Sequence, residues 1–201
     1  MTTSRASRFR RLCVFCGSNA GRNPVHADLT RELARALARA GIGVVYGGGN
    51  IGLMGVLADE TLACGGEVIG VIPHGLAVRE VAHQGLTELR VVRSMHERKA
   101  TMAELSDGFV ALPGGYGTFE ELFEIVTWAQ LGMHAKPVAI LDSDEYYAPL
   151  FALLERATAE GFLRAENRRL LLRTRSVREL LAALETHVPL PVTRWIDRAE
   201  T

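Results

Sequence analysis

The feature that most constrains this chain is the alternation of short β-rich runs with longer helical patterns. Such alternation is typical of a mainly parallel sheet whose two faces are covered by helices. Predicted strands cover residues 12–15, 44–46, 68–72, 89–92, 109–112, 138–141 and 170–172. Predicted helices cover residues 24–40, 53–64, 95–105, 118–130, 149–160 and 177–186, the first capped by Asn23 and opened by Pro24. We therefore predict a Rossmann-like, doubly wound α/β fold.

The chain length and composition fit one domain. The 201 residues are 48% hydrophobic and 23% charged, which is ordinary for a globular protein with a full core. We find no internal repeat, no low-complexity segment and no linker. The sequence predicts a flexible basic tail over residues 1–11, a single nucleotide-phosphate-binding domain over 12–186 and a C-terminal tail over 187–201.

The charge balance indicates the kind of partner. Lys plus Arg equals Asp plus Glu at 23 each, so no overall field draws the chain to nucleic acid or to an anionic membrane. No apolar run approaches the roughly 18 residues that span a bilayer, and no apolar segment follows the basic tail. We expect a small-molecule ligand, with no nucleic acid and no membrane as partner.

The three cysteines and six histidines carry no pattern for a disulfide framework or a metal. An odd, small cysteine count favours a reducing cytoplasm. Cys13 and Cys16 lie three residues apart in or beside a strand, where they point to opposite faces, so strand packing is favoured over redox or zinc chemistry. We predict a cytoplasmic protein with no metal and no cofactor.

A first glycine-rich loop follows the strand at 44–46 and opens a helix. Gly47, Gly49 and Gly52 satisfy G-x-G-x-x-G, the dinucleotide fingerprint. That fingerprint belongs after the first strand and needs an acidic residue about 20 positions on, and neither condition is met, which argues against a dehydrogenase. Backbone N–H groups at a helix N-terminus still suit an anion, so we expect Gly47, Gly48 and Gly49 to contact phosphate.

A second glycine-rich loop follows the strand at 109–112 and reads Pro113-Gly114-Gly115-Tyr116-Gly117-Thr118. It also opens a helix, and ligands of such folds bind outside the carboxyl ends of the strands. The two loops together predict a phosphate site that needs no lysine.

Glu121 has two interpretations. Thr118-x-x-Glu121 is a capping box, a pattern that recurs at Ser94-x-x-Glu97 and Ser176-x-x-Glu179. Alternatively Glu121 is catalytic, because the neighbouring carboxylates of Glu120 and Glu124 would raise its pKa beside the phosphate pocket. Spacing alone leaves both open.

A cationic partner is predicted at the start of the helix at 95–105. Met95, Arg98, Lys99 and Met102 share one helix face, and an arginine fork suits phosphate or carboxylate. We therefore favour a binding role for this face.

These motifs resemble the Lonely Guy family of cytokinin riboside 5'-monophosphate phosphoribohydrolases, long mislabelled as lysine decarboxylases. The segment 113–121 fits the family's P-G-G-x-G-T-x-x-E motif, and residues 95–99 (Met-His-Glu-Arg-Lys), 15–18, 46–49, 52–55 and 127–132 support it. The resemblance covers roughly residues 12–184. It implies hydrolysis of the N-glycosidic bond of a nucleoside 5'-monophosphate, giving free base and ribose 5-phosphate, by a homodimer with sites near the interface.

The resemblance also assigns residues. It implies that Arg98 and Glu121 are the catalytic pair. The substrate- or phosphate-binding residues that we predict are Gly17, Ser18, Gly47, Gly48, Gly49, Glu80, Met95, Lys99, Gly114, Gly115, Tyr116, Gly117, Thr118, Glu120 and Thr127.

Three alternatives bear on these assignments. A non-catalytic nucleotide or molybdenum-cofactor carrier would use the same loops, although it would not need the pair Arg98 and Glu121. A nucleosidase for plain AMP would share the whole site, because no residue fixes the group on the adenine nitrogen. A pyridoxal phosphate decarboxylase would need a Schiff-base lysine, and neither of the two lysines, Lys99 and Lys136, is a convincing one.

Overall fold

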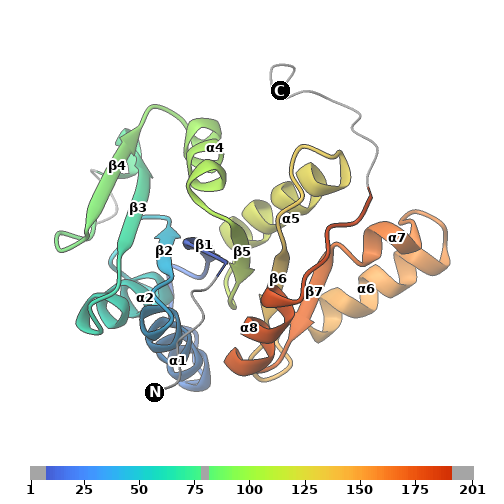
Figure 1. Ribbon diagram of the computed structural model, residues 1–201, viewed down its shortest axis with the longest axis horizontal. Coiled ribbons are helices and arrows are strands. Elements are labelled where there is room, and N and C mark those ends of the chain that lie inside the picture. Colours follow the sequence, from blue (N-terminus) through green and yellow to red (C-terminus); the bar gives the residue numbers. More distant parts are fainter. Residues whose placement is uncertain (1–7, 78–81, 192–201) are drawn as a thin grey trace.

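The computed structural model describes residues 8–77 and 82–191, and within them lies one parallel sheet of seven strands. The strands are β1 (Arg11–Phe15), β2 (Gly43–Tyr46), β3 (Val68–Pro73), β4 (Glu88–Val92), β5 (Gly108–Ala111), β6 (Val138–Leu141) and β7 (Leu171–Thr174). Their order across the sheet is β4-β3-β2-β1-β5-β6-β7, and every pairing is parallel (Figure 1). The predicted doubly wound α/β fold is confirmed.

Helices cover both faces of this sheet. They are α1 (Val25–Arg39), α2 (Gly52–Ala63), α3 (His74–Ala77), α4 (Met95–Leu105), α5 (Tyr116–Gln130), α6 (Ala148–Ala159), α7 (Ala165–Arg168) and α8 (Val177–Glu185). One core cluster joins α1, α2 and α8 to the sheet, and a second joins α4, α5 and α6 to the opposite face. None of the helices in the described ranges combines the length and apolar character needed to cross a bilayer.

Local signals account for most boundaries. The side chain of Asn23 accepts a hydrogen bond from Val25 N at 3.2 Å, although α1 begins only after Pro24. The short helices α3 and α7 were not predicted, because four residues are too few to show a helical period. Cys13 and Cys16 lie in the two different core clusters, so the packing interpretation of these thiols is confirmed.

The predicted N-terminal tail partly joins the fold. Phe9 is buried in the first core cluster, the Arg8 side chain donates to the Leu184 carbonyl at 2.7 Å, and Arg11 begins β1. Residues 1–7 and 192–201 lie outside the described ranges.

The strand order places a switch point at the centre of the sheet. β1 pairs with β2 on one side and with β5 on the other. The helix after β1 covers one face of the sheet and the helix after β5 covers the other. The loops that leave these two strands therefore diverge, which opens a crevice beyond their carboxyl ends.

Gly52, at the start of α2, allows a close contact with the loop after β1. Its φ is +62°, and a Cβ there would lie 2.3 Å from the carbonyl carbon of Ser18. Gly65 also has positive φ, +74°, but a Cβ there would meet nothing within 4 Å.

We expect Gly52→Ala to destabilise the protein by about 1–3 kcal/mol more than Gly65→Ala, because only the first adds a clash to the cost of positive φ. Urea denaturation of both variants measures the difference. Equal losses would contradict the close approach of Gly52 to the loop after β1.

Candidate active site

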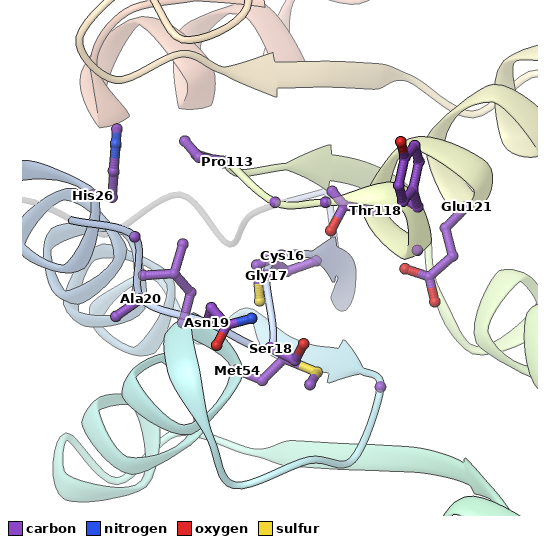
Figure 2. Close-up of a pocket in the computed structure, with 18 of the residues that line it drawn as sticks. Cys16, Gly17, Ser18, Asn19, Ala20, His26, Met54, Pro113, Thr118 and Glu121 are labelled. Carbon is purple, nitrogen blue, oxygen red and sulfur yellow. The ribbon is translucent and has the colours of Figure 1, made fainter. Parts of the chain in front are cut away.

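A cavity of about 620 Å³ lies at the switch point, beyond the carboxyl ends of β1, β2 and β5. This volume is within the range of small-molecule sites. Figure 2 shows Glu121 on one side of the cavity and His26 on the other. Most lining residues come from the loops after β1 and β5 and from the N-terminal parts of helices, and the others from β1 and from the loops after β2 and β6. They are Val14, Cys16, Gly17, Ser18, Asn19, Ala20, Gly21, Arg22, His26, Gly47, Leu53, Met54, Arg98, Pro113, Gly114, Gly115, Tyr116, Gly117, Thr118, Glu121 and Tyr146.

Backbone hydrogen bonds join the loops that form the cavity. Gly17 N donates to the Pro113 carbonyl at 3.1 Å, which joins the loop after β1 to the loop after β5. Leu53 N donates to the Gly17 carbonyl at 3.0 Å, which ties the start of α2 to the same loop. The cavity wall is therefore a connected backbone structure.

The N-terminus of α5 faces this cavity without a side-chain cap. Its N-cap is Gly115, and no side chain accepts a hydrogen bond from the first turn. Tyr116 is 93% exposed, and a Cβ at Gly115 or Gly117 would meet nothing within 4 Å. The first N–H groups of a helix lack partners within the helix and carry partial positive charge, so this end suits an anion.

The capping interpretation of Glu121 is wrong. Because α5 begins at Tyr116, Thr118 lies inside the first turn and does not cap it. The other two boxes do use their serines: Ser94 Oγ accepts from Glu97 N at 3.1 Å, and Ser176 Oγ accepts from Glu179 N at 3.2 Å. Glu121 is thus free of a capping role and faces the cavity.

The Glu121 carboxyl group is buried and has an elevated pKa. Only 7% of the residue is exposed. Burial raises the pKa of Glu121 to about 7, against the lowering effect of Arg98, whose Nη2 lies 3.4 Å from Oε1. A carboxyl group with a pKa near neutrality can take up or release a proton at physiological pH, as general acid–base catalysis requires.

Two backbone carbonyls, one from β3 and one from the loop after β2, hold Arg98. Its Nε donates to the Val71 carbonyl at 3.1 Å and its Nη2 donates to the Gly47 carbonyl at 3.4 Å. A Cβ at Gly47 would lie 2.2 Å from Nη2, so a larger residue at this position would have to displace the guanidinium. Gly47 therefore has a steric role that the glycine pattern did not predict.

Lys99 turns away from the cavity. Its Nζ forms ion pairs with Glu120 and, at 2.9 Å, with Glu124 Oε2, both on α5. Burial by itself lowers the pKa of Lys99. The hydrogen bonds and charges of the two carboxylates together outweigh this effect and raise the pKa above its usual value, so the ammonium stays charged. The three side chains link α4 to α5 through residues adjacent in sequence to Arg98 and Glu121.

The structure brings most of the predicted binding residues together, but not all. Met95, Lys99, Glu120, Thr127, Gly48 and Gly49 do not line the cavity of this chain, and Glu80 lies outside the described residues. The Gly48 carbonyl accepts from His83 N and the Gly49 carbonyl accepts from the Tyr46 hydroxyl, so both carbonyls are used within the fold. Thr127 Oγ1 donates to the Phe123 carbonyl within α5.

Several lining residues were missed. Asn19 and Arg22 follow β1, and the switch-point rule would have found them had the strand order been known. His26 on α1 and Tyr146 after β6 carry no sequence signal, because they reach the cavity only through tertiary structure.

Known proteins similar to this chain settle its family. A family model described as "Possible lysine decarboxylase" matches residues 54–184. The chain is 50% identical over 185 residues to the cytokinin riboside 5'-monophosphate phosphoribohydrolase LOG of Oryza sativa subsp. japonica, covering 92% of this chain and 76% of that protein. A protein of the same description from Arabidopsis thaliana is 45% identical over 183 residues, covering 91% and 86%.

This chain belongs to the Lonely Guy family. Solved structures of more distant proteins share its fold. A molybdenum cofactor carrier protein of Chlamydomonas reinhardtii matches with a TM-score of 0.65 at 20% identity, over 88% of this chain and 96% of that one. A molybdenum cofactor binding protein of Rippkaea orientalis matches with a TM-score of 0.67 at 19% identity, over 89% and 97%.

The decarboxylase description does not fit the lysines of this Lonely Guy chain. Lys99 is committed to Glu120 and Glu124. Lys136 Nζ donates to the carbonyls of Ala103 and Ser106 at 2.7 and 2.6 Å. Neither of these two lysines, the only ones in the sequence, lines the cavity, so no Schiff-base position for pyridoxal phosphate exists there.

The elevated pKa of Glu121 predicts a pH-dependent stability. A carboxyl group whose pKa rises from 4.5 to about 7 on folding stabilises the fold fully below pH 4.5, and this contribution is lost as pH rises through 7. We expect wild type to lose about 3 kcal/mol relative to Glu121→Gln between pH 4.5 and pH 8.

Urea denaturation of both proteins at a series of pH values measures this difference. Glu145→Gln serves as control, because Arg175 and Arg173 lower the pKa of that exposed carboxylate. Parallel pH profiles for wild type and Glu121→Gln would show that Glu121 titrates normally.

Proposed function

We propose that this protein hydrolyses the N-glycosidic bond of cytokinin riboside 5'-monophosphates to free base and ribose 5-phosphate. The observation that carries the proposal is the position of Glu121: a buried carboxyl group with a pKa of about 7, one turn inside an anion-binding helix start. The names of relatives at 45–50% identity support the same activity.

In this proposal the 5'-phosphate binds the uncapped start of α5. The N–H groups of residues 115–118 donate to its oxygens, and Gly17 and Ser18 line the opposite wall. The sugar then extends along the first turn toward Glu121, which places the anomeric carbon next to the carboxylate. A nucleoside without phosphate lacks the group that this helix start binds, so it should bind weakly.

The reaction needs a group that stabilises positive charge on the sugar and accepts a proton from the attacking water. As the C1'–N bond breaks, its electron pair leaves with the base and the sugar gains oxocarbenium character. The Glu121 carboxylate stabilises that charge and accepts a proton from the water whose oxygen bonds to C1'. Glu121 then releases this proton, directly or through solvent, to the departing base, so one water is consumed in total and the carboxylate is restored.

Arg98 favours the ionised form of Glu121 that this step requires. Its positive charge lowers the Glu121 pKa against the effect of burial. Because Val71 and Gly47 carbonyls fix the guanidinium, its position does not depend on the substrate. We propose that it orients the carboxylate and contacts the sugar.

We further propose that the enzyme acts as a cytoplasmic homodimer. Met95 on α4 and Phe123 on α5 are about two-fifths exposed, at 39% and 41%, and offer apolar area for a partner. Met95, Lys99, Glu120 and Thr127, which do not line the cavity of a single chain, would then complete the substrate site at the interface together with Glu80.

Base release tests the activity. We expect the full chain to release free base from isopentenyladenosine monophosphate and from AMP, and to act poorly on the matching nucleosides, because only the nucleotides carry the phosphate. Chromatographic detection of the base measures this. The ratio of the two rates reports the preferred base. Release from neither nucleotide would favour a non-catalytic carrier.

Glu121→Gln tests the catalytic assignment. We expect the rate to fall by about 10²–10⁴-fold with the fold intact, because the amide cannot accept the proton. Glu124→Gln, one turn along the same helix, is the matched control and should keep most of the activity. Comparable losses in both variants would argue for a general electrostatic or structural effect.

Gly47→Ala tests whether the Arg98 position matters. The added methyl group would lie 2.2 Å from Nη2 and must displace the guanidinium. We expect kcat/KM to fall about 10- to 100-fold, the cost of misplacing one active-site group. Gly75→Ala on α3, where a Cβ meets nothing within 4 Å, should leave it unchanged. Full activity in Gly47→Ala would contradict the assignment of Arg98.

A further inference from the structure

The loop between β6 and α6 reaches the phosphate-binding motif from a distant part of the sequence. Its Tyr146 lines the cavity, and the Tyr146 hydroxyl donates a hydrogen bond of 2.6 Å to the carbonyl of Gly114. Gly114 immediately precedes Gly115, the N-cap of α5. A residue outside every sequence motif therefore contacts the backbone of the loop that binds the phosphate.

This contact controls one peptide plane. The peptide bond between Gly114 and Gly115 is planar and trans, so its carbonyl and its N–H point in opposite directions. Fixing the Gly114 carbonyl on the Tyr146 hydroxyl therefore fixes the direction of the Gly115 N–H. Two consecutive glycines would otherwise allow this plane to rotate at little cost.

The backbone that presents Tyr146 is strained. Asp144 and Glu145, the two residues before it, have φ of 54° and 56°, which non-glycine residues rarely adopt. Such a conformation persists only where the surroundings over-determine it, and it concentrates at functional sites.

The surroundings here do over-determine the loop. Arg173 on β7 binds Asp142 at 2.6 Å and Glu145 at 2.8 Å, and Asn23 donates to Asp144 at 2.8 Å. His26 on α1 lies 2.6 Å from the Ser143 hydroxyl, and its ring meets the Tyr146 ring edge-on. Elements on both sides of the loop thus hold the Tyr146 hydroxyl in place.

The neighbouring tyrosine makes a similar bond with a different consequence. The Tyr147 hydroxyl donates to the Leu112 carbonyl at 2.8 Å, but Tyr147 is buried and does not line the cavity. Leu112 directly follows β5 and lies two residues before Gly114. Tyr147 therefore supports the fold, whereas Tyr146 acts on the peptide at the helix start.

We propose that Tyr146 is a positioning residue for the phosphate: its hydroxyl holds the Gly114 carbonyl so that the Gly115 N–H and the start of α5 are set before the substrate binds. This inference rests on the proposed function, because it takes the α5 start as the 5'-phosphate site. A preorganised donor set binds its anion more tightly than one that must reorient. Loss of the hydroxyl should weaken phosphate binding and leave the chemistry at Glu121 largely intact.

The test compares Tyr146→Phe with Tyr147→Phe in the full chain. We expect Tyr146→Phe to weaken the calorimetric affinity for ribose 5-phosphate by about 3- to 10-fold, the value of one hydrogen bond, with ribose as the phosphate-free control. In the base-release assay KM should rise by a similar factor, with kcat changed less than about twofold. Tyr147→Phe should lower Tm, because it removes the hydrogen bond to the buried Leu112 carbonyl, and it should leave KM unchanged.

Unchanged ribose 5-phosphate affinity in Tyr146→Phe would overturn the inference, as would an equal KM increase in Tyr147→Phe. The failure of the proposed function gives a different result. A wild-type protein that binds ribose 5-phosphate but releases no base refutes the activity, while the calorimetric comparison still decides the role of Tyr146.

Discussion

The buried contact between the Arg98 guanidinium and the Glu121 carboxylate determines how the rest of the site is built. Both side chains are about nine-tenths buried, and removing either partner would leave an uncompensated charge in the core. Carbonyls from β3 and from the loop after β2 satisfy the guanidinium, and a glycine at position 47 provides the space for it. One pair thus depends on four segments of the chain.

The positive charge of Arg98 does not return the pKa of Glu121 to its ordinary value. Burial raises the Glu121 pKa more than Arg98 lowers it, and the result is about 7. A closer, bidentate contact would hold the carboxylate ionised at all relevant pH values, whereas a missing cation would keep it protonated. The 3.4 Å separation leaves a group that exchanges a proton near neutrality, in a cavity next to a helix start suited to phosphate.

Most of the fold was predictable from the sequence, because apolar runs and their periodicity define the elements directly. All seven strands were found, and their ends differ from the structure by at most two residues. The strand order was not predictable in detail. It matters, because β1 lies between β2 and β5 and brings the loop after β1 into the cavity. From that loop the sequence had predicted only Gly17 and Ser18, whereas the cavity is also lined by Asn19 through Arg22.

The chemistry-bearing residues of the site were only partly predictable. Arg98, Glu121 and the glycines of the second loop were found from motifs, but the choice between cap and catalyst for Glu121 depended on where α5 begins. That start depends on Gly115, whose extended backbone the sequence does not reveal. Tyr146 and His26 lie 120 residues apart and meet only in the folded chain, so no local pattern could identify them.

The central claim is that the start of α5 binds a 5'-phosphate and thereby places the anomeric carbon beside Glu121. A crystal structure of Glu121→Gln soaked with isopentenyladenosine monophosphate tests it most directly. We predict phosphate oxygens within hydrogen-bonding distance of the N–H groups of residues 115–118, and C1' in contact with the side chain at position 121. Phosphate bound elsewhere, or a ribose remote from position 121, would contradict the account.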